Sequence, residues 1–84
     1  FEAYGFACKT IDGHNFDEIN AALHWAQAND KPSFIACRTV IAKDAPTKAG
    51  SSASHGSPLG ASEIEGLRKN LGWQVGNFEI PYDI

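Results

Sequence analysis

The run FIACRTVI, residues 34–41, constrains the fold more than any other stretch of this chain. In an extended conformation, successive side chains point to opposite faces of the strand. One face would carry Phe34, Ala36 and Val40, and the other Ile35, Cys37 and Ile41. Apolar side chains on both faces are typical of a strand that is covered on both sides, as in a parallel sheet. The run therefore predicts a strand of a parallel sheet.

The residues before this run predict a further strand and a connecting helix. Residues 4–11 are rich in aromatic, β-branched and small side chains and stop at a DG pair, which indicates a strand followed by a turn. Asn15 precedes a helical apolar repeat, and Glu18 stands three residues later, as in a capping box. The helix should end near Asn29, because Pro32 disfavours the helical conformation just before it. Strand, helix and strand together predict a right-handed βαβ unit.

A long loop and a second helix follow this unit. Residues 43–60 cluster Ser, Gly and Pro without apolar periodicity, which is typical of a loop. Ser62, with Glu65 three residues later, predicts another capping box, and Gly72 is placed to end the helix in the left-handed conformation. The helix is expected to bury one edge, and residues 78–84 are expected to run extended over the surface. The expected buried edge consists of Ile64, Leu67 and Leu71.

These elements predict an α/β fold. Its core is a βαβ unit of a doubly wound parallel sheet, and the long loop and the second helix follow it. A chain of 84 residues makes at most one small domain. The sequence begins with Phe1 and contains no methionine, so we expect residues 1–84 to be a fragment of one larger domain.

Charge and cysteine content exclude several functions. A formal net charge of −3 offers no basic patch for nucleic acid and no polybasic face for an anionic membrane. No apolar run reaches the roughly 18 residues of a membrane span. Cys8 and Cys37 lack CxxC spacing, and we interpret them as buried thiols in a reducing compartment. We therefore expect no nucleic acid or membrane as partner.

Two histidines follow the predicted strands. In a doubly wound sheet, ligands bind outside the carboxyl ends of the strands. His14 follows the first strand, and His55 lies in the long loop after the second. His55 is interpreted either as a proton carrier or donor to a ligand, or as an exposed loop histidine. His14 stands just ahead of the helix cap and is better explained by local structure. The acidic residues near that cap suit the helix dipole, and we expect no metal site in this chain.

Several blocks of the chain resemble bacterial transketolase in order and over nearly its whole length. They are FEAYGF, DGHNFDEI, DKPSFIACRTVI, KAGSSASHGSPLG, LGW and FEIP. The DGH block also occurs in other thiamine diphosphate enzymes, whereas HGSPLG followed by a helix and LGW is specific. The chain thus resembles the latter part of the amino-terminal domain, which holds the cofactor diphosphate.

This resemblance implies a function and its residues. The family moves a two-carbon ketol unit from a ketose phosphate to an aldose phosphate in the pentose phosphate pathway of the cytoplasm. It uses thiamine diphosphate with Mg²⁺ or Ca²⁺, at a site between the subunits of a homodimer. By resemblance, His55 contacts the cofactor diphosphate and the substrate and serves catalysis, and Ile41 packs against the cofactor. The metal-binding segment and the activating glutamate of the family lie outside this chain, so the fragment alone is expected to be inactive.

The loop departs from the family at three positions. Ala42 and Asp44 stand where bacterial members usually have glycine, and Thr47 stands where they often have asparagine. If those glycines adopt a positive φ, Ala42 and Asp44 carry a conformational cost. Two alternative functions remain: another thiamine diphosphate enzyme, such as a deoxyxylulose-phosphate synthase, and a non-catalytic interaction module.

Overall fold

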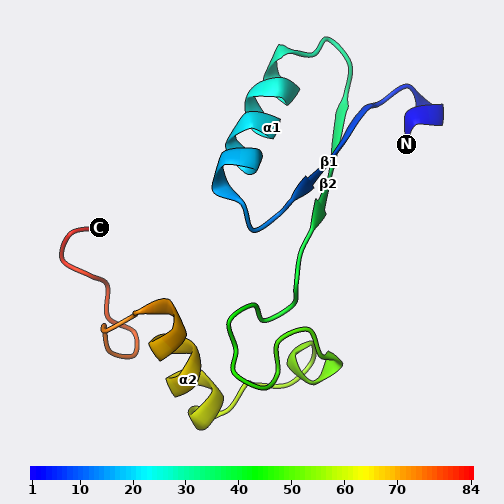
Figure 1. Cartoon of the computed structure of the whole chain (residues 1–84). Helices are drawn as coiled ribbons and strands as arrows, with labels where there is room; N and C mark the ends of the chain where they lie inside the picture. Colours follow the sequence, from blue (N-terminus) through cyan, green and yellow to red (C-terminus); the bar gives the residue numbers. More distant parts are fainter. The chain divides into compact units, whose positions relative to one another are not determined.

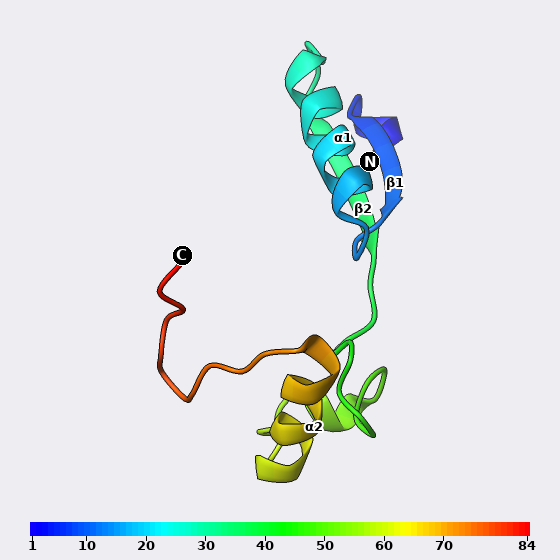
Figure 2. The ribbon, with the colours of Figure 1, turned by 60° about the vertical axis from the view of Figure 1, so that its left-hand side comes forward.

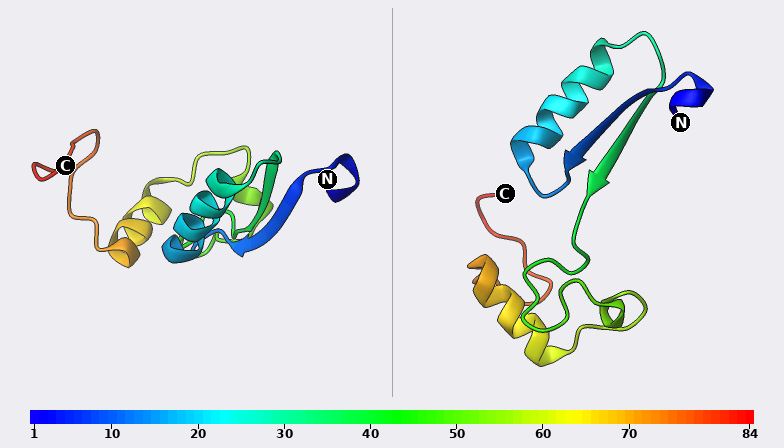
Figure 3. Two further views of the ribbon diagram at one scale, coloured as in Figure 1. Left: turned by 90° about the horizontal axis from the view of Figure 1, so that it is seen from above. Right: turned by 45° about the vertical axis from the view of Figure 1, so that its right-hand side comes forward.

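The expected strand–helix–strand unit is present in a computed structural model that describes residues 1–84 (Figure 1). Strands β1 (Ala7–Asp12) and β2 (Ser33–Arg38) pair in parallel, with Ala7 opposite Ser33 and Asp12 opposite Arg38. The two arrows point the same way in the right-hand view of Figure 3. The chain divides into two compact units, Phe1–Thr39 and Val40–Ile84, and this parallel pair belongs to the first. The α/β fold class is confirmed.

Helix α1 (Phe16–Ala28) begins and ends where the sequence predicts. The side chain of Asn15 accepts a hydrogen bond from the amide of Glu18 at 3.1 Å, which is the first half of a capping box. The second half differs, because the Glu18 carboxylate accepts from the amide of Asp12 at 3.5 Å instead of the Asn15 amide. The helix ends at Asn29, which is extended, three residues before the proline.

Both strands are shorter than predicted. The first begins at Ala7, because Glu2–Tyr4 form a 3-10 turn (η1) that Gly5 closes at a φ of 88°. The second ends at Arg38 and not at Ile41. Its partner ends opposite it at Asp12, so the residues beyond Arg38 find no ladder to extend.

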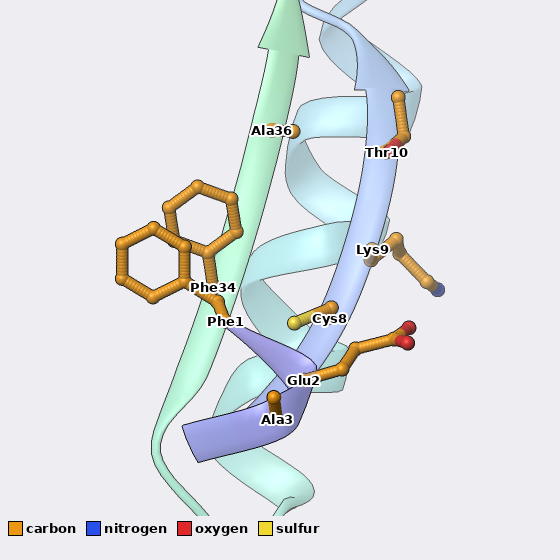
Figure 4. Close-up of a pocket in the computed structure, with 8 residues that line it drawn as sticks. All are labelled: Phe1, Glu2, Ala3, Cys8, Lys9, Thr10, Phe34 and Ala36. Atoms are coloured by element: carbon orange, nitrogen blue, oxygen red, sulfur yellow. The ribbon is translucent and has the colours of Figure 1, made fainter. Parts of the chain in front are cut away.

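Helix α1 lies along one face of the strand pair (Figure 2). This face buries Ile11 and Ala22, and the ammonium group of Lys9 lies 4.9 Å from the ring centroid of Trp25. On the opposite face the ring of Phe1 stacks on Phe34 with centroids 4.0 Å apart, as Figure 4 shows with α1 behind the strands. Within this chain, only one face of the pair is therefore covered by a helix.

Cys8 and Cys37 are free thiols, as expected, but neither is fully buried. Cys8 is half-buried on the face away from α1, and Cys37 is exposed near the end of β2. The expectation of burial was wrong for Cys37, because the strand pair ends one residue beyond it.

Helix α2 (Ala61–Leu71) belongs to the second unit and begins differently from the prediction. Its N-cap is Gly60, with a φ of 94°, and no side chain caps it. The predicted capping box of Ser62 and Glu65 is therefore wrong. The positive φ that glycine permits at position 60 starts the helix before Ser62 can serve as its cap.

The buried face of α2 also differs from the expected one. Ile64 and Leu71 are 40% and 57% exposed, whereas Glu63 is 7% exposed. The helix packs through Gly66, where an added Cβ would lie 2.2 Å from Cγ of Pro46. The expected apolar edge was wrong for Ile64 and Leu71, whereas Leu67 is half-buried, because a polar face of the helix meets the turn that opens the long loop.

The end of α2 confirms the prediction for Gly72. Its φ is 66° and its amide bonds the carbonyl of Lys69 at 3.2 Å, while Trp73 bonds the carbonyl of Arg68 at 2.8 Å. This pair of bonds is a Schellman motif. Residues 78–84 are exposed as expected, apart from the half-buried Pro81, but they contain a turn in which the amide of Ile84 donates to the carbonyl of Pro81 at 3.2 Å. Neither helix is long and apolar enough to cross a membrane.

The glycine of the DGH block generates a test of the first unit. A Cβ on Gly13 would lie 2.6 Å from Cγ2 of Thr39 and 3.0 Å from Cβ of Cys37. We expect Gly13→Ala to lower the free energy of unfolding by about 1–3 kcal/mol, the usual cost of overpacking. Urea denaturation measures this change. Adding Thr39→Ser removes the nearest methyl group and should restore part of the loss; a neutral Gly13→Ala would contradict the packing described.

Candidate functional site

The residues expected to carry function lie in the second unit, between Val40 and Gly60. The segment opens with a turn in which Ala45 donates to the carbonyl of Ala42 at 3.0 Å. The amide of Gly50 then donates to the carbonyl of Ile41 at 2.8 Å and closes the first part of the loop. Ala45 is buried, so this turn provides the small apolar centre of the unit.

Two residues of this turn adopt a left-handed backbone. Ala42 has a φ of 50° and Asp44 a φ of 71°. These are the two positions where the resemblance stated above implies glycine, so both residues carry the conformational cost expected of a positive φ. The carboxylate of Asp44 pairs with the ammonium group of Lys43 at 2.8 Å. Because that pair is partly exposed, it neutralises the local charge without adding much stability.

Two contacts hold the base of the long loop, one to the first turn of α2 and one between the two ends of the loop. The hydroxyl of Thr47 donates to the Glu63 carboxylate, and the Thr47 amide donates to the same group at 3.1 Å and 3.3 Å. The ammonium group of Lys48 donates to the carbonyl of Leu59 at 2.8 Å. We call residues 48–59 the His55 loop, since these bonds hold its two ends together.

The hydrogen bonds lower the pKa of Glu63 below its ordinary value of 4.5. The Thr47 hydroxyl makes the largest contribution, the backbone of Thr47 and Lys48 and the charge of Lys48 add to it, and burial of the carboxylate opposes it. A lowered pKa means that the folded state prefers the ionised group. Its stabilisation is therefore fully present above about pH 4.5 and is lost as the pH falls through the lower folded pKa.

His55 is exposed at the end of a short 3-10 helix (η2, Ser52–Ser54). Ser51 caps this turn by accepting from the amide of Ala53 at 3.2 Å, and the His55 amide donates to the carbonyl of Ser52 at 3.1 Å. The imidazole makes no hydrogen bond within the chain. Both ring nitrogens are thus free to meet a ligand.

Ile41 is 42% exposed and stands at the entrance of the same segment. Its carbonyl is held by Gly50, so the backbone links it to the loop that carries His55. The two residues expected to touch the cofactor therefore belong to one hydrogen-bonded segment.

The other histidines lie in the first unit. The amide of His14 donates to the Asp12 carboxylate at 2.9 Å, which is the local turn expected ahead of α1. Nδ1 of His24 lies 2.9 Å from the carbonyl of Asn20 within the helix. Arg38 is exposed at the end of β2. The chain holds no group of three or more His, Cys, Asp or Glu side chains that could bind a metal ion.

The contact between Glu63 and Thr47 was not predicted from the sequence. Glu63 follows Ser62, the predicted helix cap, and an acid at the start of a helix is ordinarily explained by the helix dipole. Only the fold shows that its carboxylate serves a segment 16 residues earlier.

Comparison with known proteins identifies the family of this segment. Residues 1–84 match the family described as "Transketolase, thiamine diphosphate binding domain". The chain belongs to this family. A transketolase structure from Campylobacter jejuni matches 99% of the chain with a TM-score of 0.93 and 42% sequence identity. The match covers 13% of that protein.

Two curated relatives are similar over the whole chain. It is 48% identical to "Transketolase 2" of Vibrio vulnificus over 85 residues, and 49% identical to the chromosomal transketolase of Cupriavidus necator over 86 residues. The chain spans 13% of the length of each relative. These matches confirm the resemblance to transketolase and do not support the alternative of a deoxyxylulose-phosphate synthase.

The left-handed Ala42 leads to a test of loop strain. The left-handed conformation costs a residue with a Cβ about 1–2 kcal/mol, and glycine avoids this cost. Glycine also makes the unfolded chain more flexible, which lowers the free energy of unfolding by about 0.4–1 kcal/mol. We therefore expect Ala42→Gly to raise the free energy of unfolding by about 0.5–1 kcal/mol in urea denaturation. Ala49→Gly, in the same segment but without a positive φ, should lower it. Equal effects of the two changes would contradict the strain at Ala42.

Proposed function

We propose that this chain acts as part of the thiamine diphosphate-binding domain of a transketolase. In that role it takes part in the transfer of a two-carbon ketol unit from a ketose phosphate to an aldose phosphate. The match of the family to residues 1–84 carries the proposal, and the exposed His55 within HGSPLG supports it.

His55 is the residue that would contact the cofactor diphosphate and the sugar phosphate. Its imidazole is exposed and has no hydrogen bond within the chain, so its ring nitrogens are available to a ligand. The residues around it are Ser, Ala and Gly, which let a ligand approach the backbone closely. The lysines of the segment are less free, since Lys43 pairs with Asp44 and Lys48 holds Leu59. His55 is therefore the best-placed donor to an anion in this segment.

Ile41 would pack against the cofactor. It is apolar, 42% exposed, and linked to the His55 loop through Gly50. Apolar side chains predominate in cofactor sites, where a few polar groups fix the orientation. When bound, thiamine diphosphate supplies the carbanion chemistry of the reaction, and these residues would hold it in place.

The rest of the site lies outside residues 1–84 in this proposal. Since the chain has no metal-binding cluster, the ligands of Mg²⁺ or Ca²⁺ would come from another segment of the same protein. The activating glutamate, the partner subunit of a homodimer, the remainder of the amino-terminal domain and a cytoplasmic location are proposed from the family match. The alternative of a non-catalytic interaction module predicts that these additions are not needed.

The first prediction from this proposed function concerns the 84-residue chain by itself. We expect no ketol transfer, and thiamine diphosphate binding no tighter than about 1 mM, or roughly 4 kcal/mol, because the metal ligands and the activating base are elsewhere. Isothermal titration calorimetry with cofactor and Mg²⁺ measures the affinity. Micromolar binding would show that residues 1–84 contain a complete cofactor site.

The second prediction concerns His55 in a full-length protein that contains these residues. We expect His55→Ala to lower kcat/KM by about 10²- to 10⁴-fold, the range of a positioned acid–base group. A residue that only held the cofactor would regain turnover at saturating cofactor, whereas one that also serves the substrate would not. Steady-state kinetics at saturating cofactor and metal separate the two roles.

His24→Ala is the matched control for this measurement. Its imidazole is exposed on α1 and bonds only the helix backbone, so the variant should keep the kinetics of the unchanged protein. Near-normal turnover in His55→Ala, or an equal loss in His24→Ala, would contradict the role given to His55.

A further inference from the structure

The His55 loop is held at its base by polar contacts to the start of α2. Thr47 precedes the loop, and both its hydroxyl and its amide donate hydrogen bonds to the Glu63 carboxylate. Lys48 bonds the carbonyl of Leu59 at the other end. The residue before the loop is thus bonded to the first turn of α2, the two ends of the loop are bonded to each other, and His55 lies between those ends.

Glu63 is the most enclosed group at this base. It is 7% exposed, and both carboxylate oxygens accept from Thr47. Two further contacts of α2 hold the turn before Thr47: Gly66 packs against Pro46, and the side-chain amide of Asn70 donates to the Asp44 carbonyl at 2.7 Å. The helix therefore contacts the turn at several points, and Glu63 is the member of this face that stands next to the His55 loop.

The carboxylate of Glu63 does not cap its own helix. Helix α2 has no side-chain cap at Gly60, and an acid at the third helical position commonly bonds back to the helix start. Glu63 instead directs both oxygens to the segment that precedes the loop. The hydrogen bonds of the Glu63 side chain therefore stabilise the start of the loop and not the start of the helix.

We propose that Glu63 is a positioning residue. Its hydrogen bonds to Thr47 fix where the His55 loop begins relative to α2, and they thereby position His55 for its ligand. This inference rests on the proposed function of His55. A displacement of about 1 Å at a reacting group costs on the order of 10²-fold in rate. Loss of this anchor should therefore reduce turnover without unfolding the protein.

The first test uses the full-length protein that contains these residues. We expect Glu63→Ala to lower kcat, at saturating cofactor and metal, by about 10- to 10²-fold, and to weaken the apparent cofactor affinity. Glu65→Ala is the matched control, since Glu65 is exposed on the same helix and its side chain makes no hydrogen bond within the chain. Unchanged kcat and cofactor affinity in a folded Glu63→Ala protein, or an equal loss in Glu65→Ala, would overturn the proposal.

A pair of substitutions at the donor keeps the test valid if Glu63→Ala does not fold. Thr47→Val removes only the hydroxyl bond to Glu63, whereas Thr47→Ser retains it. We expect Thr47→Val to lower kcat in the same direction as Glu63→Ala, and Thr47→Ser to remain near the unchanged protein. A role in stability alone would leave kcat of the folded Thr47→Val protein unchanged, which would contradict positioning.

Amide hydrogen exchange gives a readout that does not depend on activity. In the cofactor-free protein, the amides of Gly50, Ser54 and His55 bond within the segment, and their exchange should become at least about 10-fold faster in Glu63→Ala when local opening is easier. Glu65→Ala should leave them unchanged. Unchanged exchange rates in Glu63→Ala would overturn the proposal. If the protein without any substitution showed no ketol transfer, the proposed function would be refuted instead, and the exchange rates would still test whether Glu63 holds the loop.

Discussion

The second unit depends on one polar face of α2. Glu63, Gly66 and Asn70 stand at helical spacing, and each meets the turn of residues 44–47 through a different contact. A glycine permits the close approach, and the carboxylate and the amide fix the register by bonding specific partners. A buried carboxylate that lost its donors would be costly, so this face favours one arrangement of the helix against the turn.

Hydrogen bonds dominate this unit because it has little apolar material to bury. Ala45 is the buried hydrophobic residue there, while Ile64, Leu71 and Trp73 of the helix and its end remain exposed. A loop ordered by a few polar contacts at its base opens at a lower free-energy cost than one packed into a core. Such a loop suits a residue that must meet a ligand, and it makes the geometry of the base decisive for the position of His55.

Local patterns were sufficient to predict most of the first unit. Asn15 caps α1, Asn29 ends it and the two flanking strands pair in parallel. Each of these features depends on residues close in sequence or on a period that repeats within one element. The left-handed Gly72 was predictable for the same reason. The ends of the strands were not, because a strand stops where its partner stops, and no single strand contains that information.

The support of the candidate site was hidden from the sequence for a physical reason. Ser62 and Glu65 have the spacing of a capping box, yet the helix begins after Gly60. The acidic side chain that is buried is that of Glu63, and it contacts Thr47. Which acid of a helix start is buried depends on a donor 16 residues away, and the spacing of the acids within the helix does not encode it. His55 was noticeable because an imidazole in a loop of small residues is chemically unusual, whereas Glu63 is an ordinary residue for its position. In this unit, sequence patterns therefore point to the group that would meet the ligand, and the fold is needed to find the group that holds it there.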